Sequence, residues 1–189
     1  MATVIPFEDR ALARLRERLG AAEEARADLI AFARGHSGAV ASIHEAVLAA
    51  IGAGGIEQLV AVVTEDWPLI LGLDSVAFAL IIGGDGFRAD CHGVQRIEPR
   101  LLERSISQVG DVEMRGVARG HPLFGPMSKT IRAEALIAVD CGAGLPRGLL
   151  LLGQRDALSP DTRHGAILLR FLGRSLAAML ARWLTAPTD

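Results

Sequence analysis

Apolar residues recur at alternating steps of three and four along residues 8–50. Ten of the twelve positions on this stripe are apolar, and only Arg26 and His36 interrupt it. One register kept over more than five heptads is typical of a coiled coil or long bundle helix, rather than of a helix packed on a globule. Each glycine in a helix interior costs about 1 kcal/mol relative to alanine. The pattern therefore leaves open whether the arm is one helix or is broken at Gly35–Gly38.

The period of the pattern changes after this arm. A helix is predicted over residues 56–66, and Pro68 is expected to kink or stop it. Further helices are predicted at 98–108 and from 160 to about 184, and strands at 75–82, 87–94, 112–118, 133–140 and 147–155. This order predicts an α+β fold in which helices flank an antiparallel sheet. We expect residues 1–52 to form a helical, coiled-coil-like arm and residues 53–189 to form the domain.

The last two predicted strands have apolar residues on both faces at their centres. Leu136, Ile137 and Val139 lie in the first of them, and Leu149–Leu152 in the second. Strands of this kind are usually interior strands that are covered on both sides. The sequence therefore predicts that helices or loops cover each face of the sheet.

Composition narrows the class of protein. Half of the 189 residues are hydrophobic, 22% are charged, and the formal net charge is -2. Acidic residues interrupt almost every arginine cluster, which argues against direct binding to nucleic acid. The N-terminus lacks a basic segment followed by an apolar one, and the dense apolar runs are only as long as strands. We expect a cytoplasmic protein that does not bind a membrane.

The residues most able to carry chemistry are sparse. Cys91 and Cys141 lie fifty positions apart without a CxxC motif, which fits a reducing compartment. The five histidines show no metal-binding spacing such as HxxxH, so no metal site is expected. The glycine-rich stretch 142–148 joins two strands instead of opening a helix, so it is predicted to be a hairpin loop rather than a phosphate cradle.

The most specific pattern lies near the C-terminus, in GLLLLGQRD at residues 148–156, SPDTRHG at 159–165 and LLRFLG at 168–173. With Leu123-Phe124-Gly125 and the heptad arm, these segments resemble the bacterial GAF-like family catalogued as domain of unknown function 484. The resemblance covers nearly the whole chain. Gln154 departs from the pattern, because a small hydroxyl residue is expected after that glycine.

The resemblance implies a non-catalytic regulatory or interaction module, able to sense a small ligand and to signal to a separate protein, with no cofactor. GAF folds usually hold ligands between the sheet and the loops opposite the terminal helices, here residues 94–132. A small-ligand site needs an apolar concavity with a few polar anchors. The candidate ligand-binding residues are His121, Phe124, Met127, Lys129 and Arg132. The alternative is that Leu123 and Phe124 only fill the core.

A homodimer is also predicted, because the helices at both ends of a GAF domain can pack into a bundle. An apolar stripe on a lone helix would leave an exposed seam. The candidate dimer-interface residues are Leu12, Leu15, Leu19, Leu29 and Trp183.

Three alternatives remain open. The first is a GAF-type thiol reductase acting on free methionine sulfoxide, which requires Cys91 and Cys141 to lie close together. The second is an accessory protein of chromosome recombination, since relatives tend to be encoded beside a tyrosine recombinase that could be its protein partner. The third is bilin attachment, because Cys91 and His92 resemble the Cys-His pair of some GAF photoreceptors. Their predicted place inside a strand favours an ordinary sheet position.

Overall fold

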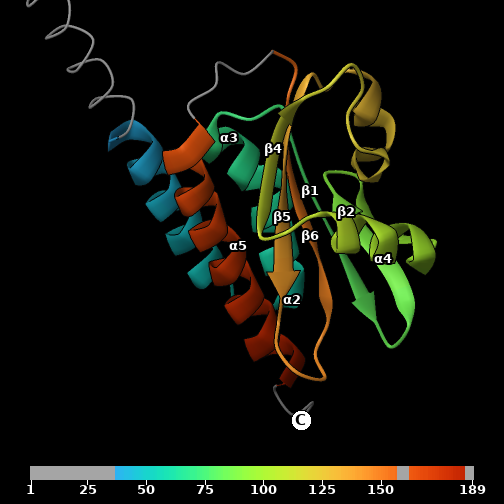
Figure 1. The fold of residues 1–189 in the computed structure, drawn as a ribbon. Coiled ribbons are helices and arrows are strands. Elements are labelled where there is room, and N and C mark those ends of the chain that lie inside the picture. The colour runs from blue at the N-terminus through green and yellow to red at the C-terminus, as the bar shows by residue number, and fades with distance from the viewer. Residues whose placement is uncertain (1–36, 157–161, 186–189) are drawn as a thin grey trace, which may run out of the picture. The chain divides into compact units, whose positions relative to one another are not determined.

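A computed structural model of the chain describes residues 37–156 and 162–185 (Figure 1). The described residues from Ser42 onward belong to one compact unit. After a helix over residues 37–51, the elements are α2 (Ile56–Ala61), η1 (Val62–Asp66), α3 (Trp67–Leu71), β1 (Ser75–Ile82), β2 (Asp85–Asp90), β3 (Gly93–Ile97), α4 (Pro99–Gln108), β4 (Val112–Gly116), η2 (Pro122–Lys129), β5 (Ala133–Asp140), β6 (Arg147–Gln154) and α5 (Thr162–Thr185).

The six strands form one sheet in the order β3-β2-β1-β6-β5-β4, and every neighbouring pair is antiparallel. The pairing of β1 with β6 places Phe78 opposite Leu150, at the centre of the sheet. Helices flank the sheet, so the predicted α+β class is confirmed.

Side chains alternate between two separate cores, one on each face of the sheet. One core is covered by residues 42–51 of the first described helix and by α2, α3 and α5, and we call this side the helix face (Figure 1). The other is covered by α4 and η2, and we call it the loop face. In β6, for example, Leu150 packs on the helix face and Leu149 on the loop face. Alternation between two cores explains the continuous apolar runs and confirms that these strands are interior.

Pro68 does not end the helical segment. It lies in the first turn of α3, directly after the π-helical turn η1, where a missing N–H is tolerated. The helical backbone then continues through α3 until Gly72, whose φ of 64° ends it. Trp67 is fully buried there, and its indole N–H donates to the carbonyl of Ala46 at 2.8 Å.

The helix over residues 37–51 contributes Ile43, Val47 and Ala50 to the helix-face core. These residues lie on the apolar stripe read from the sequence, so here the stripe packs on the domain itself. The prediction of a helix that does not pack on a globule is therefore wrong over these positions. Residues 1–36, which carry Leu12, Leu15, Leu19 and Leu29, lie outside the described part of the chain.

The strand predicted over residues 87–94 is wrong, because the chain turns in its middle. β2 ends at Asp90, and β3 begins at Gly93 as an additional edge strand. The carboxylate of Asp90 accepts the backbone N–H of His92 at 2.8 Å, which stabilises the turn. Gly93 has a φ of 97°, a conformation that other residues rarely adopt. Cys91 and His92 therefore occupy a hairpin turn and not a strand interior.

Among the described helices, none is long and apolar enough to cross a membrane.

Candidate functional site

The segment 117–132 covers the loop face of the sheet and carries all five candidate ligand residues. η2 begins after His121 and is kinked at Gly125, which has a φ of 58° and a ψ of -130°. Other residues rarely adopt this positive φ, and a Cβ atom at Gly125 would also lie 2.1 Å from a terminal nitrogen of Arg88. Glycine is therefore required where the segment passes over β2.

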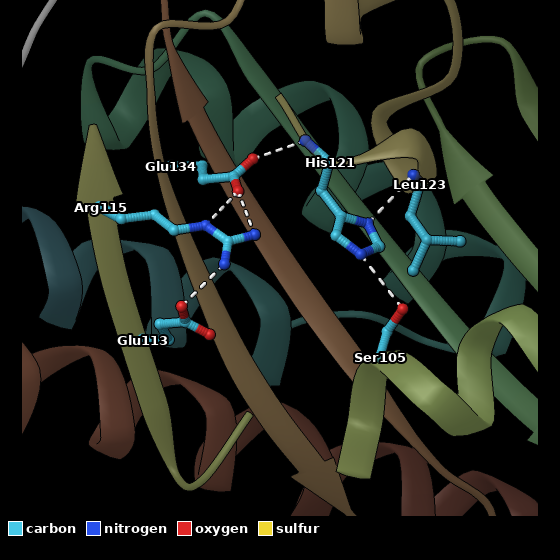
Figure 2. A network of polar contacts seen from close by, with 6 residues as sticks. All are labelled: Ser105, Glu113, Arg115, His121, Leu123 and Glu134. Carbon is cyan, nitrogen blue, oxygen red and sulfur yellow. Dashed lines mark hydrogen bonds and ion pairs between the residues drawn. The ribbon is translucent and has the colours of Figure 1, made fainter. Parts of the chain in front are cut away.

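A buried carboxylate fixes the start of this segment (Figure 2). Glu134 of β5 is 1% exposed, and one of its oxygens accepts the backbone N–H of His121 at 2.6 Å. Its other oxygen accepts the Nε–H of Arg115 at 2.8 Å. Arg115 lies opposite Glu134 on β4 and also pairs with Glu113 at 2.8 Å. The arginine thus neutralises a charge that would be costly to bury alone.

The imidazole of His121 links η2 to α4 (Figure 2). Its Nδ1 accepts the backbone N–H of Leu123 at 3.2 Å, and its Nε2 lies 3.1 Å from the hydroxyl of Ser105. That hydroxyl donates to the carbonyl of Leu101 at 2.9 Å. Nε2 must therefore carry the proton and donate it to Ser105, which defines one neutral tautomer. Burial of the ring lowers the pKa of His121, which favours the same neutral form.

Ser105, His121 and Glu134 differ from a catalytic triad in two respects. A histidine base must accept the proton of the serine, whereas His121 donates to Ser105. The acidic residue must orient the imidazole, whereas Glu134 binds the backbone of His121. The cluster therefore positions η2 over the sheet, and this geometry does not activate Ser105 as a nucleophile.

The structure separates the four candidate ligand residues other than His121 into two groups. Phe124 is 1% exposed and, with Leu123, fills the loop-face core; Met127 is half-buried against that core. Lys129 and Arg132 are exposed, and Arg132 donates to the carbonyls of Lys129 and Ile131. Phe124 is thus a core residue in this structure. The ligand-binding role of the five candidates stays a prediction.

An apolar hollow of about 430 Å³ lies on the helix face instead. It is lined by side chains from α2, the β1–β2–β3 end of the sheet and the C-terminal half of α5. Its apolar lining includes Ile56, Val60, Leu80, Phe87, Val94 and Leu180. Sequence reasoning missed this hollow, because it looked for a cavity only beneath the loops.

A second exposed feature of the helix face is an apolar surface along two neighbouring helices. Leu48 and Ile51 are 67% and 57% exposed, and Ile167 and Phe171 of α5 are 61% and 45% exposed. The rings of His44 and Phe171 meet edge to face with centroids 6.3 Å apart, so the two helices lie side by side here. Large apolar patches on a protein surface often mark interaction sites. We call these four residues the helix-pair surface.

Trp183 is placed differently from the helix-pair surface. It is half-buried against the helix-face core, with the guanidinium of Arg182 5.4 Å from its ring centroid. Its part in a dimer interface stays a prediction.

The two cysteines lie at opposite ends of the sheet. Ala89, Phe78, Leu150 and Ile137 pair in one row across β2, β1, β6 and β5. From this row, β2 runs toward Cys91 and β5 runs the opposite way, toward Cys141. The two cysteines are thus separated by three strand spacings across the sheet and by about six residues along the strands. The distance between them is therefore more than ~20 Å. A disulfide requires Cα atoms within about 7 Å. This geometry argues against a reductase that joins the two thiols.

The protonation of Cys141 is also unfavourable for thiol chemistry. Burial of this thiol, assisted by the neighbouring Asp140, raises its pKa to about 11. A nucleophilic cysteine needs its thiolate form near neutral pH. Cys91, by contrast, is exposed in the β2–β3 turn.

The β2–β3 turn is also where metal-ligating side chains gather in the described residues. Atoms of Asp90, Cys91 and His92 that can bind a metal all lie within 4.8 Å of one another. The sequence search overlooked this group, because it considered only histidine spacing and placed these residues in a strand.

Several solved structures are similar to the chain. One is a protein with bound biliverdin IXa in its far-red absorbing dark state, with a TM-score of 0.54 and 13% identity over 76% of this chain and 99% of that one. Another is the chromophore-binding domain of the bacteriophytochrome of Stigmatella aurantiaca, with a TM-score of 0.52 and 14% identity over 74% of this chain and 59% of that one. These similarities establish a shared fold.

The GAF domain of a two-component sensor histidine kinase from Bacillus halodurans is also similar, with a TM-score of 0.46 and 12% identity over 58% of this chain and 82% of that one. No curated protein matches the sequence. A family model described as "Protein of unknown function, DUF484" matches residues 1–185. The chain therefore belongs to the DUF484 family, and its fold is GAF-like.

Proposed function

We propose that the chain is a non-catalytic regulatory module that binds a small apolar ligand, acts as a dimer and passes its state to a separate protein. The helix-pair surface is the observation that carries this proposal. Four large apolar side chains exposed on two adjacent helices are costly in water, and a second copy would bury them in a bundle. The same patch on both partners satisfies the symmetry of a two-fold dimer.

The apolar hollow supports the ligand-binding part of the proposal. Its volume of about 430 Å³ lies within the range of small-molecule sites. The lining is mostly aliphatic and aromatic, which suits an apolar ligand better than a polar one.

Leu180 connects the hollow with the proposed dimer interface. It lines the hollow and belongs to α5, the helix that also carries Ile167 and Phe171. A ligand that moves Leu180 would shift α5, and small helix shifts at subunit interfaces are a common way to transmit a signal.

The oligomeric state of the full-length chain tests the proposal. We expect light scattering to give twice the 20.0 kDa chain mass at micromolar concentration. A Leu48→Glu, Ile167→Glu double variant should be monomeric, because each glutamate would be desolvated in the bundle. Leu69→Glu is the matched control: Leu69 is 83% exposed and lies on α3, so its replacement should leave the mass unchanged.

The arm can be tested separately, with Leu15→Glu and Leu19→Glu. The arm forms part of the interface if this variant also loses the dimer. A monomeric wild-type chain, or a dimer that persists in the Leu48→Glu, Ile167→Glu variant, would contradict the proposal.

A further inference from the structure

The turn between β2 and β3 brings three different metal-binding groups together. Asp90 is the last residue of β2, and Cys91 and His92 form the turn before Gly93. The Sγ of Cys91 lies 3.4 Å from Nδ1 of His92, and the same nitrogen lies 3.4 Å from Oδ1 of Asp90. A carboxylate, a thiol and an imidazole thus face one small volume.

These distances match those between ligands of a tetrahedral zinc ion. Zinc lies about 2.3 Å from sulfur and about 2.0–2.2 Å from nitrogen or oxygen, so neighbouring ligand atoms are roughly 3.3–3.6 Å apart. The two contacts of His92 have that separation already. The third pair, the Sγ of Cys91 and the carboxylate of Asp90, lies within 4.8 Å, and the exposed side chain of Cys91 can close the remaining gap around an ion.

Asp90 is held in place by groups that leave one oxygen facing the turn. Its Oδ2 pairs with Arg88 at 2.8 Å, and the side chains of Arg88 and Asp90 are only 7% and 6% exposed. Gln95 accepts a hydrogen bond from Arg88 at 2.8 Å, which orients the guanidinium. In metal sites, residues that hydrogen-bond to a carboxylate ligand, as Arg88 does here, orient that ligand toward the ion. Oδ1 accepts the backbone N–H of His92 and keeps a further lone pair toward the turn.

We propose that Asp90, Cys91 and His92 bind Zn²⁺ or a similar borderline divalent ion. Thiolate and imidazole ligands select zinc-like ions over Mg²⁺ and Ca²⁺, which prefer oxygen ligands. On binding, the thiol of Cys91 releases its proton to solvent, and His92 coordinates through a neutral Nδ1. Cys91 and His92 are exposed, so the fourth position of the ion is open to water or to another ligand.

Cobalt titration of the full-length, tag-free chain tests this site. After treatment with a chelator, Co²⁺ should bind one ion per chain and give a thiolate-to-metal absorption band, and Zn²⁺ should displace it. Cys91→Ser should abolish the band. His92→Ala and Asp90→Asn should each weaken binding at least tenfold; asparagine keeps an acceptor for Arg88.

Cys141→Ser is the matched control, because Cys141 lies at the other end of the sheet. His44→Ala is a second control, since His44 is exposed on the helix face. Both should bind Co²⁺ as the wild type does. The site is overturned by a wild-type chain without the band, by a band that survives in Cys91→Ser, or by one that is lost in Cys141→Ser. None of these outcomes depends on the dimer.

Discussion

His121 uses both ring nitrogens and its backbone N–H to hold η2 over the sheet. Because burial lowers its pKa below 6.5, the folded chain binds a proton less readily than the unfolded chain does. The contribution of neutral His121 to the free energy of unfolding is complete above pH 6.5. It is lost as the pH falls from there through the pKa of His121 in the folded chain. We expect the free energy of unfolding to fall over this range. Urea denaturation between pH 8 and pH 5 measures it.

His121→Asn provides the control for this pH dependence. Asparagine can still accept the N–H of Leu123, because it is a good N-cap residue, but it does not titrate. The variant should lose less stability on acidification than the wild type. Equal slopes in both proteins would show that His121 does not cause the effect.

Only part of the polar network around His121 was predictable at the level of single residues. His121 itself was identified because it lies in residues 94–132, the loop region where the family resemblance implies a ligand site. Glu134 was not, since nothing in an apolar strand marks one glutamate as the buried partner of a loop that begins 13 positions earlier. The strand register brings Glu134 opposite Arg115, and that register is a tertiary property.

α5 lies so close to β5 that one position on it requires glycine. A Cβ atom at Gly173 would lie 2.4 Å from Cγ2 of Ile137 and 3.3 Å from the carbonyl oxygen of Ala138. Ile137 is buried and stiff at its branched carbon, so it has no room to move away. We expect Gly173→Ala to lower the free energy of unfolding by about 1–3 kcal/mol, as overpacking does. Thermal or chemical denaturation measures this change.

Gly165→Ala in the same helix is the matched control. A Cβ atom there would have no neighbour nearer than 3.6 Å. The helix gains up to about 1 kcal/mol when alanine replaces glycine. The two substitutions should therefore change stability in opposite directions. A gain from both would mean that α5 lies further from the sheet than described.

The predictable elements were those with a strong apolar period. The strands at 75–82 and 133–140 begin and end where the sequence indicated. The sequence did not reveal the turn at Cys91 and His92. Its causes are the hydrogen bond that the backbone N–H of His92 donates to Asp90 and the positive φ of Gly93. A hydrophobicity pattern does not distinguish Asp90 and Gly93 from ordinary strand residues.

The apolar hollow sets the specificity of the proposed ligand site, and its rim can be changed without disturbing the core. Val94 lines the hollow but is 61% exposed, so Val94→Glu should fold normally. A charge at the rim would have to be desolvated by an apolar ligand. We expect the variant to bind a fluorescent apolar dye at least tenfold more weakly than the wild type does.

Leu69→Glu serves as the control for dye binding, since it removes an exposed leucine that does not line the hollow. It should bind the dye as the wild type does. If both variants lose the same affinity, the dye reports general surface hydrophobicity and not the hollow.

The strand order has a consequence for the chain while it is being synthesised. The central contact of the sheet joins Phe78 to Leu150, 72 positions later, whereas β1 and β2 form a local hairpin. At ~5–20 residues per second, a ribosome needs ~4–14 seconds to add the missing segment. Throughout that interval the inner edge of β1 is unpaired and apolar. A newly made chain therefore exposes an unpaired, apolar strand edge to chaperones and to other nascent chains. In the folded protein this edge is paired with β6.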